Sequence, residues 1–337
     1  MRILVIRNDK LGDFMLAWPA LALLRKNLPK AHIAVLVPSY TEALAKVCNY
    51  IDEVVVDPRL KGELKNGRAL AKLIKSKKFD VVITLFSRFD TGYAVWSAGI
   101  PERYAPATKL AQVFYNRRIA QRRSRSEKPE YEYNLDLAQA FLASQGVLKP
   151  KPAESPYLAF KPADAKKVKL KFLKKHRIPA TKQLVFVHAG HGGSANNLSV
   201  LQYAELVKFL ATSKKRHFVL TAGPGEEGHA HRFSRMLEKI PHAVYISDEG
   251  LAAFAKHLQL AEVFISGSTG PLHLAAALDV PTAAFYPRRR SSTALRWQTV
   301  NLEKERLAFS PPADVAEGDM SRIDIRAAAA DIAKRLL

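Results

Sequence analysis

Hydrophobic positions in the first half of the chain fall into short runs that alternate with patterns of helical period. The short runs predict strands at residues 2–7, 32–37, 53–57 and 80–86, and the helical patterns predict helices at 14–27, 41–48 and 68–77. Strands that alternate with helices in this way are joined by right-handed crossovers. The first half therefore predicts a doubly wound parallel sheet.

The same alternation restarts after a proline-containing segment, residues 147–156, which follows a predicted helix at 133–145. Proline neither continues a helix nor joins a central strand ladder, so this segment is the expected linker. Beyond it we expect strands at 184–188, 217–221, 243–246, 262–266 and 282–286, and helices at 200–210, 226–239, 251–258 and 271–278. The pattern predicts an N-terminal domain at 1–155, a C-terminal domain at 156–320, and a terminal helix within 321–337 that packs back on a domain, with the N-terminal one as a candidate.

Composition limits the class of protein. The 337 residues are 48% hydrophobic and 25% charged, which excludes a disordered chain and fits about two globular domains. No uncharged apolar run approaches the roughly 18–20 residues that span a bilayer, and residues 1–10 lack the apolar core of a secretion signal. The single cysteine, Cys48, excludes an intramolecular disulfide framework and a cysteine-rich metal site. We expect a cytoplasmic protein with no metal and no prosthetic cofactor.

The charge points to anionic partners. The 53 Lys and Arg outnumber the 31 Asp and Glu, which gives a net charge of +22 and favours phosphorylated substrates, anionic lipid surfaces or nucleic acid. Basic residues gather at 117–125, where the absence of periodicity predicts a mobile loop, and at 161–177, where lysines surround a narrow apolar stripe as on a solvated helix. Neither cluster interleaves aromatic residues and no zinc-finger or RNA-recognition signature occurs, so we do not expect nucleic acid as the partner.

Asp13 follows the first predicted strand and stands next to the start of a helix. A carboxylate at that place is commonly an N-cap, which contributes about 0.5–2 kcal/mol to stability. Ligands of open parallel sheets bind at the carboxyl ends of the strands, where the same carboxylate can act as a general base on a hydroxyl. Gly12, directly before it, suits a tight turn. The residues alone leave both roles of Asp13 open.

Two glycine-containing loops follow strands of the second half. Residues 188–197 hold three glycines, and residues 221–227 hold two more together with Glu226. Glycine lets backbone N–H groups approach a phosphate closely. Glu226 stands in a first helical turn, where it either caps the helix or hydrogen-bonds a ribose. Neither loop has the spacing of a P-loop or of the dinucleotide fingerprint.

The strongest local signal is residues 265–278. A strand ends there, Ser268 or Thr269 can cap the following helix, and Pro271 suits its first turn. The N–H groups of such a turn form a diphosphate site. His273 either donates a hydrogen bond to a phosphate oxygen or is simply packed. The arginines at 288–290 follow the next strand and form either a solvated loop or a set of guanidinium contacts to phosphate.

Three segments together resemble glycosyltransferase family 9, the bacterial heptosyltransferases that build the lipopolysaccharide inner core from ADP-heptose. They are residues 6–21 (Ile-Arg-Asn-Asp-Lys-Leu-Gly-Asp-Phe-Met-Leu-Ala-Trp-Pro-Ala-Leu), 188–197 and 268–278, which occur in the family's order and span nearly the whole chain. The resemblance implies an α/β protein of the GT-B fold, with two Rossmann-like, doubly wound parallel-sheet domains facing across a cleft. It also implies an acceptor on the N-terminal domain, a nucleotide-sugar on the C-terminal domain, and inversion at the anomeric carbon.

The resemblance further implies roles for single residues. Asp13 is similar to the family's catalytic base, Thr269, Gly270 and His273 to its diphosphate contacts, and Glu226 to its ribose contact. The remaining expected donor contacts are Gly190, Gly192, Gly193, Ser194, Asn196, Ser268 and Arg288, and the expected acceptor contacts are Lys10, Gly12, Arg117, Arg118, Arg122 and Arg123. Two positions depart from the family's pattern, since Asn196 replaces a lysine that is usually followed by Xaa-Trp-Pro and Ser268 replaces the aspartate of Asp-Thr-Gly.

The expected function is an inverting, metal-independent glycosyltransferase that moves heptose from ADP-heptose onto the lipopolysaccharide inner core. Its expected partners are the nucleotide-sugar, an anionic glycolipid such as the lipid A-Kdo core, and the cytoplasmic face of the inner membrane as a peripheral contact. Two alternatives remain open, a family member with another nucleotide-sugar donor and a catalytically silent nucleotide-sugar-binding or scaffold protein.

Overall fold

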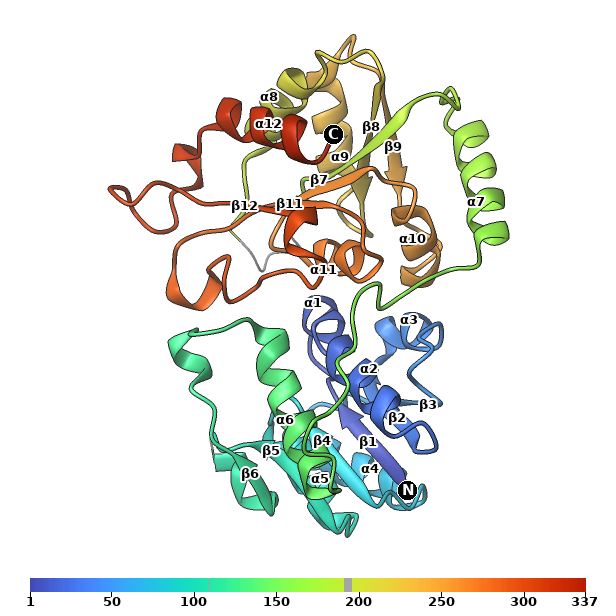
Figure 1. Ribbon diagram of the computed structural model, residues 1–337, viewed down its shortest axis with the longest axis vertical. Coiled ribbons are helices and arrows are strands. Elements are labelled where there is room, and N and C mark those ends of the chain that lie inside the picture. Colours follow the sequence, from blue (N-terminus) through green and yellow to red (C-terminus); the bar gives the residue numbers. More distant parts are fainter. Residues whose placement is uncertain (109, 191–195) are drawn as a thin grey trace. The chain divides into compact units, whose positions relative to one another are not determined.

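A computed structural model describes residues 1–108, 110–190 and 196–337, and the chain divides into two compact units, Met1–Glu154 and Ser155–Leu337 (Figure 1). Each unit has its own sheet and its own hydrophobic core. The division falls within the proline-containing segment that ends at residue 156.

The sheet of the N-terminal unit has six parallel strands in the order β3-β2-β1-β4-β5-β6. The strands are β1 (Arg2–Ile6), β2 (His32–Pro38), β3 (Glu53–Asp57), β4 (Val81–Thr84), β5 (Glu102–Pro106) and β6 (Arg117–Ile119). The helices are α1 (Leu11–Met15), α2 (Trp18–Asn27), α3 (Glu42–Ala45), α4 (Glu63–Lys75), α5 (Phe89–Ser97) and α6 (Glu130–Ser144), with short 3₁₀ turns η1 (Ser39–Thr41), η2 (Leu110–Phe114) and η3 (Arg123–Arg125).

Helices cover both faces of this sheet because consecutive side chains of a strand point to opposite sides. Leu4 and Ile6 of β1 pack with residues of α4 and α5 in one core cluster. Ile3 and Val5 point the other way and are equally buried. Helices α2 and α6 pack against each other on the face toward the viewer in Figure 1.

The sheet of the C-terminal unit also has six parallel strands, in the order β12-β11-β10-β7-β8-β9. The strands are β7 (Gln183–His188), β8 (Arg216–Ala222), β9 (His242–Ile246), β10 (Val263–Gly267), β11 (Thr282–Phe285) and β12 (Arg306–Phe309). The helices are α7 (Pro162–Lys175), α8 (Val200–Leu210), α9 (Glu227–Leu237), α10 (Leu251–Leu258), α11 (Gly270–Ala277) and α12 (Ile325–Arg335), with 3₁₀ turns η4 (Arg290–Ser292), η5 (Glu303–Glu305) and η6 (Met320–Arg322).

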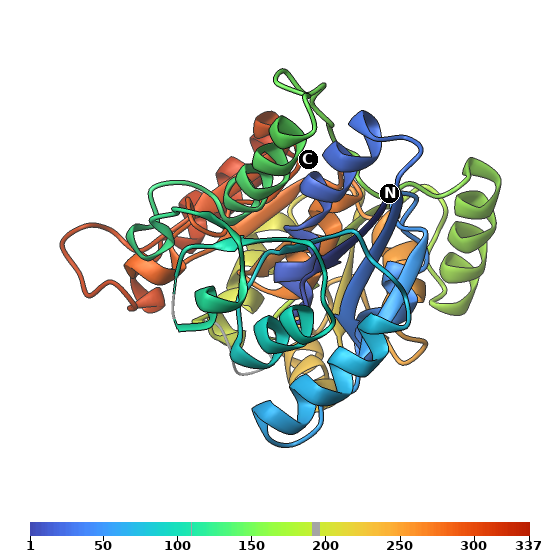
Figure 2. The same ribbon diagram turned by 90° about the horizontal axis from the view of Figure 1, so that it is seen from below.

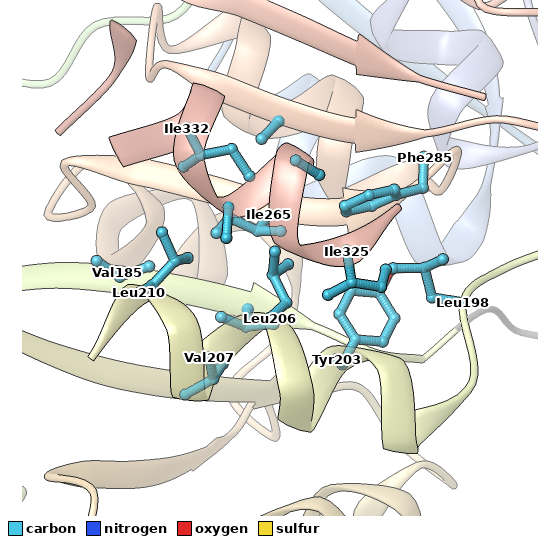
Figure 3. Packing of buried hydrophobic residues seen from close by; sticks show 14 of the residues in the cluster. Val185, Leu198, Tyr203, Leu206, Val207, Leu210, Ile265, Phe285, Ile325 and Ile332 are labelled. Atoms are coloured by element: carbon cyan, nitrogen blue, oxygen red, sulfur yellow. The ribbon is translucent and has the colours of Figure 1, made fainter. Parts of the chain in front are cut away.

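The terminal helix α12 belongs to the core of the C-terminal unit. Its Ile325 and Ile332 pack with Leu206 and Leu210 of α8 and with Ile265 of β10 (Figure 3). Helix α12 therefore completes the core of the C-terminal unit, whereas the sequence had offered the N-terminal domain as a candidate. The four buried positions of α12 form the apolar stripe of an amphipathic helix, and they are Ile325, Ala328, Ala329 and Ile332.

Several predicted elements need correction. The helix expected at 14–27 is two helices, α1 and α2, and the basic segment expected as a mobile loop contains the edge strand β6. Helix α5 and strands β5, β6 and β12 were not predicted. The solvated helix expected at 161–177 is present as α7, with Phe172 and Leu173 buried.

The predicted α/β class and the two doubly wound parallel sheets are confirmed. Counted within its own unit, each sheet has the strand order 3-2-1-4-5-6 of the Rossmann fold. The order reverses between β1 and β4 in one sheet and between β7 and β10 in the other, and ligands of such sheets bind outside the carboxyl ends of the strands at that point. The segments after β1, β7 and β10 are therefore where each unit offers a site.

Candidate active site

Asp13 does not cap a helix. Helix α1 begins at Leu11, with Lys10 at the N-cap position, so Asp13 is the third helical residue and Gly12 the second. Gly12 is thus part of a helix and not of the tight turn that we expected. The carboxylate of Asp13 instead accepts a hydrogen bond from the guanidinium of Arg7, and its side chain is 14% exposed. The capping interpretation is wrong, and the carboxylate lies at the carboxyl end of β1 in a nearly buried position.

Arg7 organises this part of the site. Its guanidinium is almost wholly buried and donates to Asp9 at 3.0 Å, to Glu130 at 3.0 Å and to the amide oxygen of Asn134 at 3.2 Å, in addition to Asp13. Glu130 and Asn134 lie on α6, more than 120 residues along the chain. A buried arginine with this many acceptors holds its partners in one geometry. The orientation of Asp13 is therefore fixed before any substrate binds.

The environment tunes the basicity of Asp13. Burial raises the pKa of its carboxyl to about 6, because a buried carboxylate loses hydration. Arg7 opposes this shift, while the negative charges of Asp9 and Glu130 add to it. Burial also disfavours the charged form of Arg7, but the three carboxylates outweigh it and raise the pKa of Arg7. At neutral pH Asp13 is therefore ionised and has a higher proton affinity than an exposed aspartate.

A buried hydrogen-bond network connects the loops that follow β1, β3 and β4. The amide of Asn8 donates to Asp57 at the end of β3 at 2.6 Å, and Asn66 of α4 donates to Asp57 at 3.3 Å and to Asp90 of α5 at 2.9 Å. Arg88 pairs with Asp90. These contacts join the segments after β1, β3 and β4. Sequence reasoning missed them, because each residue looks like an ordinary loop or helix position.

The basic cluster divides into two groups. Arg117 and Arg118 on β6, and Arg122 after it, are exposed. Arg123 instead donates to the Leu85 carbonyl at 2.9 Å and to Glu130 at 2.9 Å. Arg123 thus shares Glu130 with Arg7 and serves the internal network, whereas Arg117, Arg118 and Arg122 are exposed to solvent.

In the C-terminal unit, Gly190 and Glu226 meet at the ends of β7 and β8. A Cβ atom on Gly190 would lie 2.3 Å from Oε1 of Glu226, so only glycine admits the carboxylate there. Glu226 is the N-cap residue of α9, and it accepts a hydrogen bond from the Gly223 backbone N–H at 2.9 Å without capping the helix. His188 Nε2 lies 3.7 Å from the Glu226 carboxylate. The side chain of Glu226 is 20% exposed.

Asn197 ties the loop after β7 to the end of β10. Its Nδ2 donates to the carbonyls of Ala189 and Gly190 at 3.3 Å, and its Oδ1 accepts from Tyr203 at 2.6 Å. A Cβ on Gly267 would lie 2.3 Å from the same Oδ1. Asn197 is the last residue of the segment 188–197, but the sequence assigned it no role. The expected donor contact was its neighbour Asn196, which stands where the family has a lysine.

The side chain of the N-cap residue does not cap the start of α11. Thr269 is its N-cap residue, but its hydroxyl contacts Ser266 Oγ at 2.8 Å and makes no cap hydrogen bond. Gly270, Leu272 and His273 supply the first-turn N–H groups, since Pro271 has none. The expected cap is therefore absent, although the expected helix start is right.

His273 is packed, as one of its two interpretations required. The side chain is 2% exposed, burial lowers its pKa to about 4, and its Nδ1 has no hydrogen-bond partner among the described residues. It is therefore a neutral imidazole at neutral pH. Neutral imidazole still carries one N–H that can donate to a ligand oxygen.

Asn196 lies beside Arg289 at Gly318. Asn196 Nδ2 donates weakly to the Gly318 carbonyl at 3.4 Å. A Cβ on Gly318 would lie 2.8 Å from Arg289 Nη2 and 3.0 Å from Asn196 Nδ2. Arg288, the expected contact, donates instead to the carbonyl of Pro312. The expected contacts Gly192, Gly193 and Ser194 lie outside the described residues.

Comparisons with known proteins bear on this arrangement. Residues 67–307 match glycosyltransferase family 9 (heptosyltransferase). The chain is 46% identical over 314 residues to a candidate glycosyltransferase of Haemophilus influenzae, covering 93% of this chain and 90% of the other. It is 25% identical to lipopolysaccharide heptosyltransferase 1 of Escherichia coli, covering 85% and 86%. Its fold is similar to that of the ADP-heptose lipopolysaccharide heptosyltransferase II of E. coli, with a TM-score of 0.78, 18% identity, and coverage of 100% and 98%.

The family match spans more than half of the chain, and the Haemophilus relative extends over nearly all of it. The fold likeness agrees with the two Rossmann-type sheets and with the predicted GT-B class. The resemblance that three sequence segments indicated is therefore confirmed, and the chain belongs to glycosyltransferase family 9.

Proposed function

We propose that the protein is an inverting glycosyltransferase that transfers heptose from ADP-heptose to an inner-core lipopolysaccharide acceptor, with Asp13 as the general base. The observation that carries this proposal is the position of Asp13 at the carboxyl end of β1, held by Arg7 with a pKa raised to about 6. General bases work best with a pKa near the operating pH.

The chemistry requires one proton transfer. The acceptor hydroxyl gives its proton to Asp13 while its oxygen forms a bond to the anomeric carbon. The bond from that carbon to the phosphate oxygen breaks, and the nucleoside diphosphate leaves with the electron pair. A single in-line displacement inverts the configuration, and no residue of the chain becomes covalently bound to the sugar.

The C-terminal unit supplies the donor contacts in this proposal. The N–H groups at the start of α11 and the partial positive charge of the helix favour the diphosphate. Glu226 accepts hydrogen bonds from the ribose hydroxyls through a carboxylate that lies against Gly190 at the loop after β7. Arg289 offsets the charge of the leaving group near Asn196.

The acceptor is proposed to be an anionic glycolipid. Lys10 and the exposed arginines Arg117, Arg118 and Arg122 would attract its phosphates and carboxylates. Among the described residues, no helix is both long and apolar enough to cross a membrane. Contact with the cytoplasmic face of the inner membrane would then be peripheral.

One observation favours a different donor as the second candidate. The family's lysine and aspartate are replaced by Asn196 and Ser268, and Arg289 of another segment approaches Gly318 together with Asn196. These changes lie on the donor side only, whereas Asp13 is retained. They therefore favour a donor with a different sugar or nucleobase over a loss of catalysis.

A thermal-shift screen of nucleotide-sugars separates the candidates. A ligand at about 100 times its dissociation constant adds roughly 2.7 kcal/mol of stability. ADP-heptose should raise Tm more than ADP-glucose, UDP-glucose or GDP-mannose. A larger Tm shift with another nucleotide-sugar would identify that compound as the donor in place of ADP-heptose. No Tm shift with any of them would contradict a nucleotide-sugar site.

A further inference from the structure

One outer face of the N-terminal unit exposes aromatic side chains in a regular row. Phe89, Tyr93 and Trp96 of α5 are spaced i, i+4, i+7 and so share one side of the helix. Phe89 is 42% and Trp96 is 53% exposed. Soluble proteins rarely leave large apolar side chains exposed together without a partner for them.

The turn η2 extends this row. Gly92 brings η2 close to α5, since a Cβ there would lie 2.9 Å from the ring of Phe114. The Phe114 ring in turn contacts those of Phe89, Tyr93 and Trp96, with centroids 5.3, 6.2 and 6.0 Å apart. Leu110 and Val113 of the same turn are 87% and 70% exposed. We call these residues of α5 and η2 the aromatic face.

A basic row runs along the neighbouring helix. Helices α4 and α5 lie side by side (Figure 2), and a Cβ on Gly67 of α4 would lie 2.9 Å from the Tyr93 ring. Both helices cover the same face of the sheet, so their outward residues share one surface. The outward side of α4 carries four exposed cations at i, i+3, i+7 and i+10, namely Lys65, Arg68, Lys72 and Lys75.

We propose that this surface, the aromatic face together with the basic row of α4, docks on an anionic lipid bilayer. Aromatic rings enter the boundary between headgroups and acyl chains, while Lys and Arg remain among anionic headgroups. A second copy of this chain is a poor occupant, because it would bring two basic rows and two chains of charge +22 together. The inference rests on the proposed function in one respect, namely that a glycolipid acceptor lies in such a bilayer.

Vesicles without any acceptor test docking separately from catalysis. We compare co-sedimentation with phosphatidylglycerol-containing vesicles and with pure phosphatidylcholine vesicles at physiological salt. The wild type should bind the anionic vesicles, and a Phe89→Ser, Trp96→Ser, Val113→Ser variant should bind at least about tenfold more weakly. Replacing the four cations of the basic row by Gln should weaken vesicle binding by a similar factor, since each Lys or Arg near an anionic membrane surface contributes to the binding free energy.

Helix α7 offers the matched control. Replacing its exposed Lys166, Lys167, Lys169 and Lys171 by Gln removes the same charge from a helix without an aromatic row. This variant should keep most of the vesicle affinity, and all variants should keep the wild-type Tm and the wild-type transfer rate on a water-soluble, deacylated acceptor. Equal losses from the α4 and α7 variants, or no loss from the aromatic variant, would overturn the proposal. Concentration-dependent dimerisation that the aromatic variant abolishes, without vesicle binding, would assign the surface to a second copy instead.

Discussion

At the scale of the residue, Asp13 gains its properties from groups that are distant in sequence. Its place next to a predicted helix start left an N-cap and a general base as alternatives, and only the fold brings Arg7, Asp9 and Glu130 together around the carboxylate. Position at a strand end was visible in the sequence. The pairing with a buried arginine was not, because Glu130 comes from a helix that no local pattern connects to β1.

This environment predicts the pH dependence of transfer. Asp13 must be ionised to accept a proton, and burial raises its pKa to about 6. The rate constant kcat/KM should therefore fall as pH drops below about 6, by nearly tenfold for each further pH unit, and should level off above it. Initial rates between pH 4.5 and 8 check this expectation.

Replacing Arg7 by Lys provides a control for the acid limb. Arg7 lowers the pKa of Asp13, and lysine keeps the charge but not the fork of donors. The acid limb of this variant should move to higher pH while the activity at high pH is partly retained. An acid limb near the ordinary aspartate range in the wild type would contradict the tuned base.

At the scale of the element, strong patterns were predicted well and edge elements were missed. Helices α8 and α10 have the predicted bounds, because their apolar residues recur at helical spacing. Strand β6 escaped prediction because its three residues, Arg117 to Ile119, form an exposed sheet edge without hydrophobic alternation. On the donor side, the loop positions were predicted, but the close approaches of Asn197 to Gly267 and of Arg289 to Gly318 were not.

The exposed part of the basic cluster predicts an effect on the acceptor. Replacing Arg117, Arg118 and Arg122 by Gln should raise the KM for an anionic acceptor severalfold and flatten its salt dependence, because screening acts on exposed charges beyond about 8 Å at physiological ionic strength. Initial-rate kinetics across salt concentrations measure both effects. Arg123→Gln is the contrast, since this internal residue should lower Tm and leave the salt dependence unchanged. Identical acceptor kinetics in the triple variant would make these arginines a solvated surface only.

Arg289, in the segment after β11, is expected to contribute to the affinity for the nucleotide. Arg289→Gln should weaken ADP binding by about tenfold, because a charge-assisted contact to phosphate is worth roughly 1.5–3 kcal/mol before solvent screening. Adding Asn196→Lys should restore part of the affinity, since the two side chains meet at Gly318. Arg290→Gln, at the exposed neighbouring position, is the matched control. Calorimetry decides, and equal ADP affinity in Arg289→Gln and wild type would remove this arginine from the donor site.

At the scale of the whole molecule, buried histidine couples stability to pH. Burial lowers the pKa of His273 to about 4 from an ordinary value of 6.5. The folded protein keeps this imidazole neutral, whereas the unfolded chain takes up a proton below about pH 6.5. The contribution to the free energy of unfolding is therefore lost as pH falls from about 6.5 toward 4.

The His273→Gln variant isolates this contribution. Between pH 7 and pH 5 the wild type should lose about 2 kcal/mol more stability than the variant. Urea unfolding at both pH values measures the difference. Parallel losses in the two proteins would mean that His273 titrates normally.

The most direct test of the central claim is the rate of heptose transfer from ADP-heptose to a heptose-free inner-core acceptor, compared between wild type and Asp13→Asn. An amide keeps the shape of the carboxylate but takes up no proton at neutral pH, so removal of the general base should slow transfer by about 10²–10⁴. Tm and ADP affinity should stay close to wild type, and Asp9→Asn, which also removes a carboxylate from Arg7, should cost far less. Mass spectrometry should find one added heptosyl residue in the wild-type reaction. Near-wild-type turnover by Asp13→Asn would contradict the account.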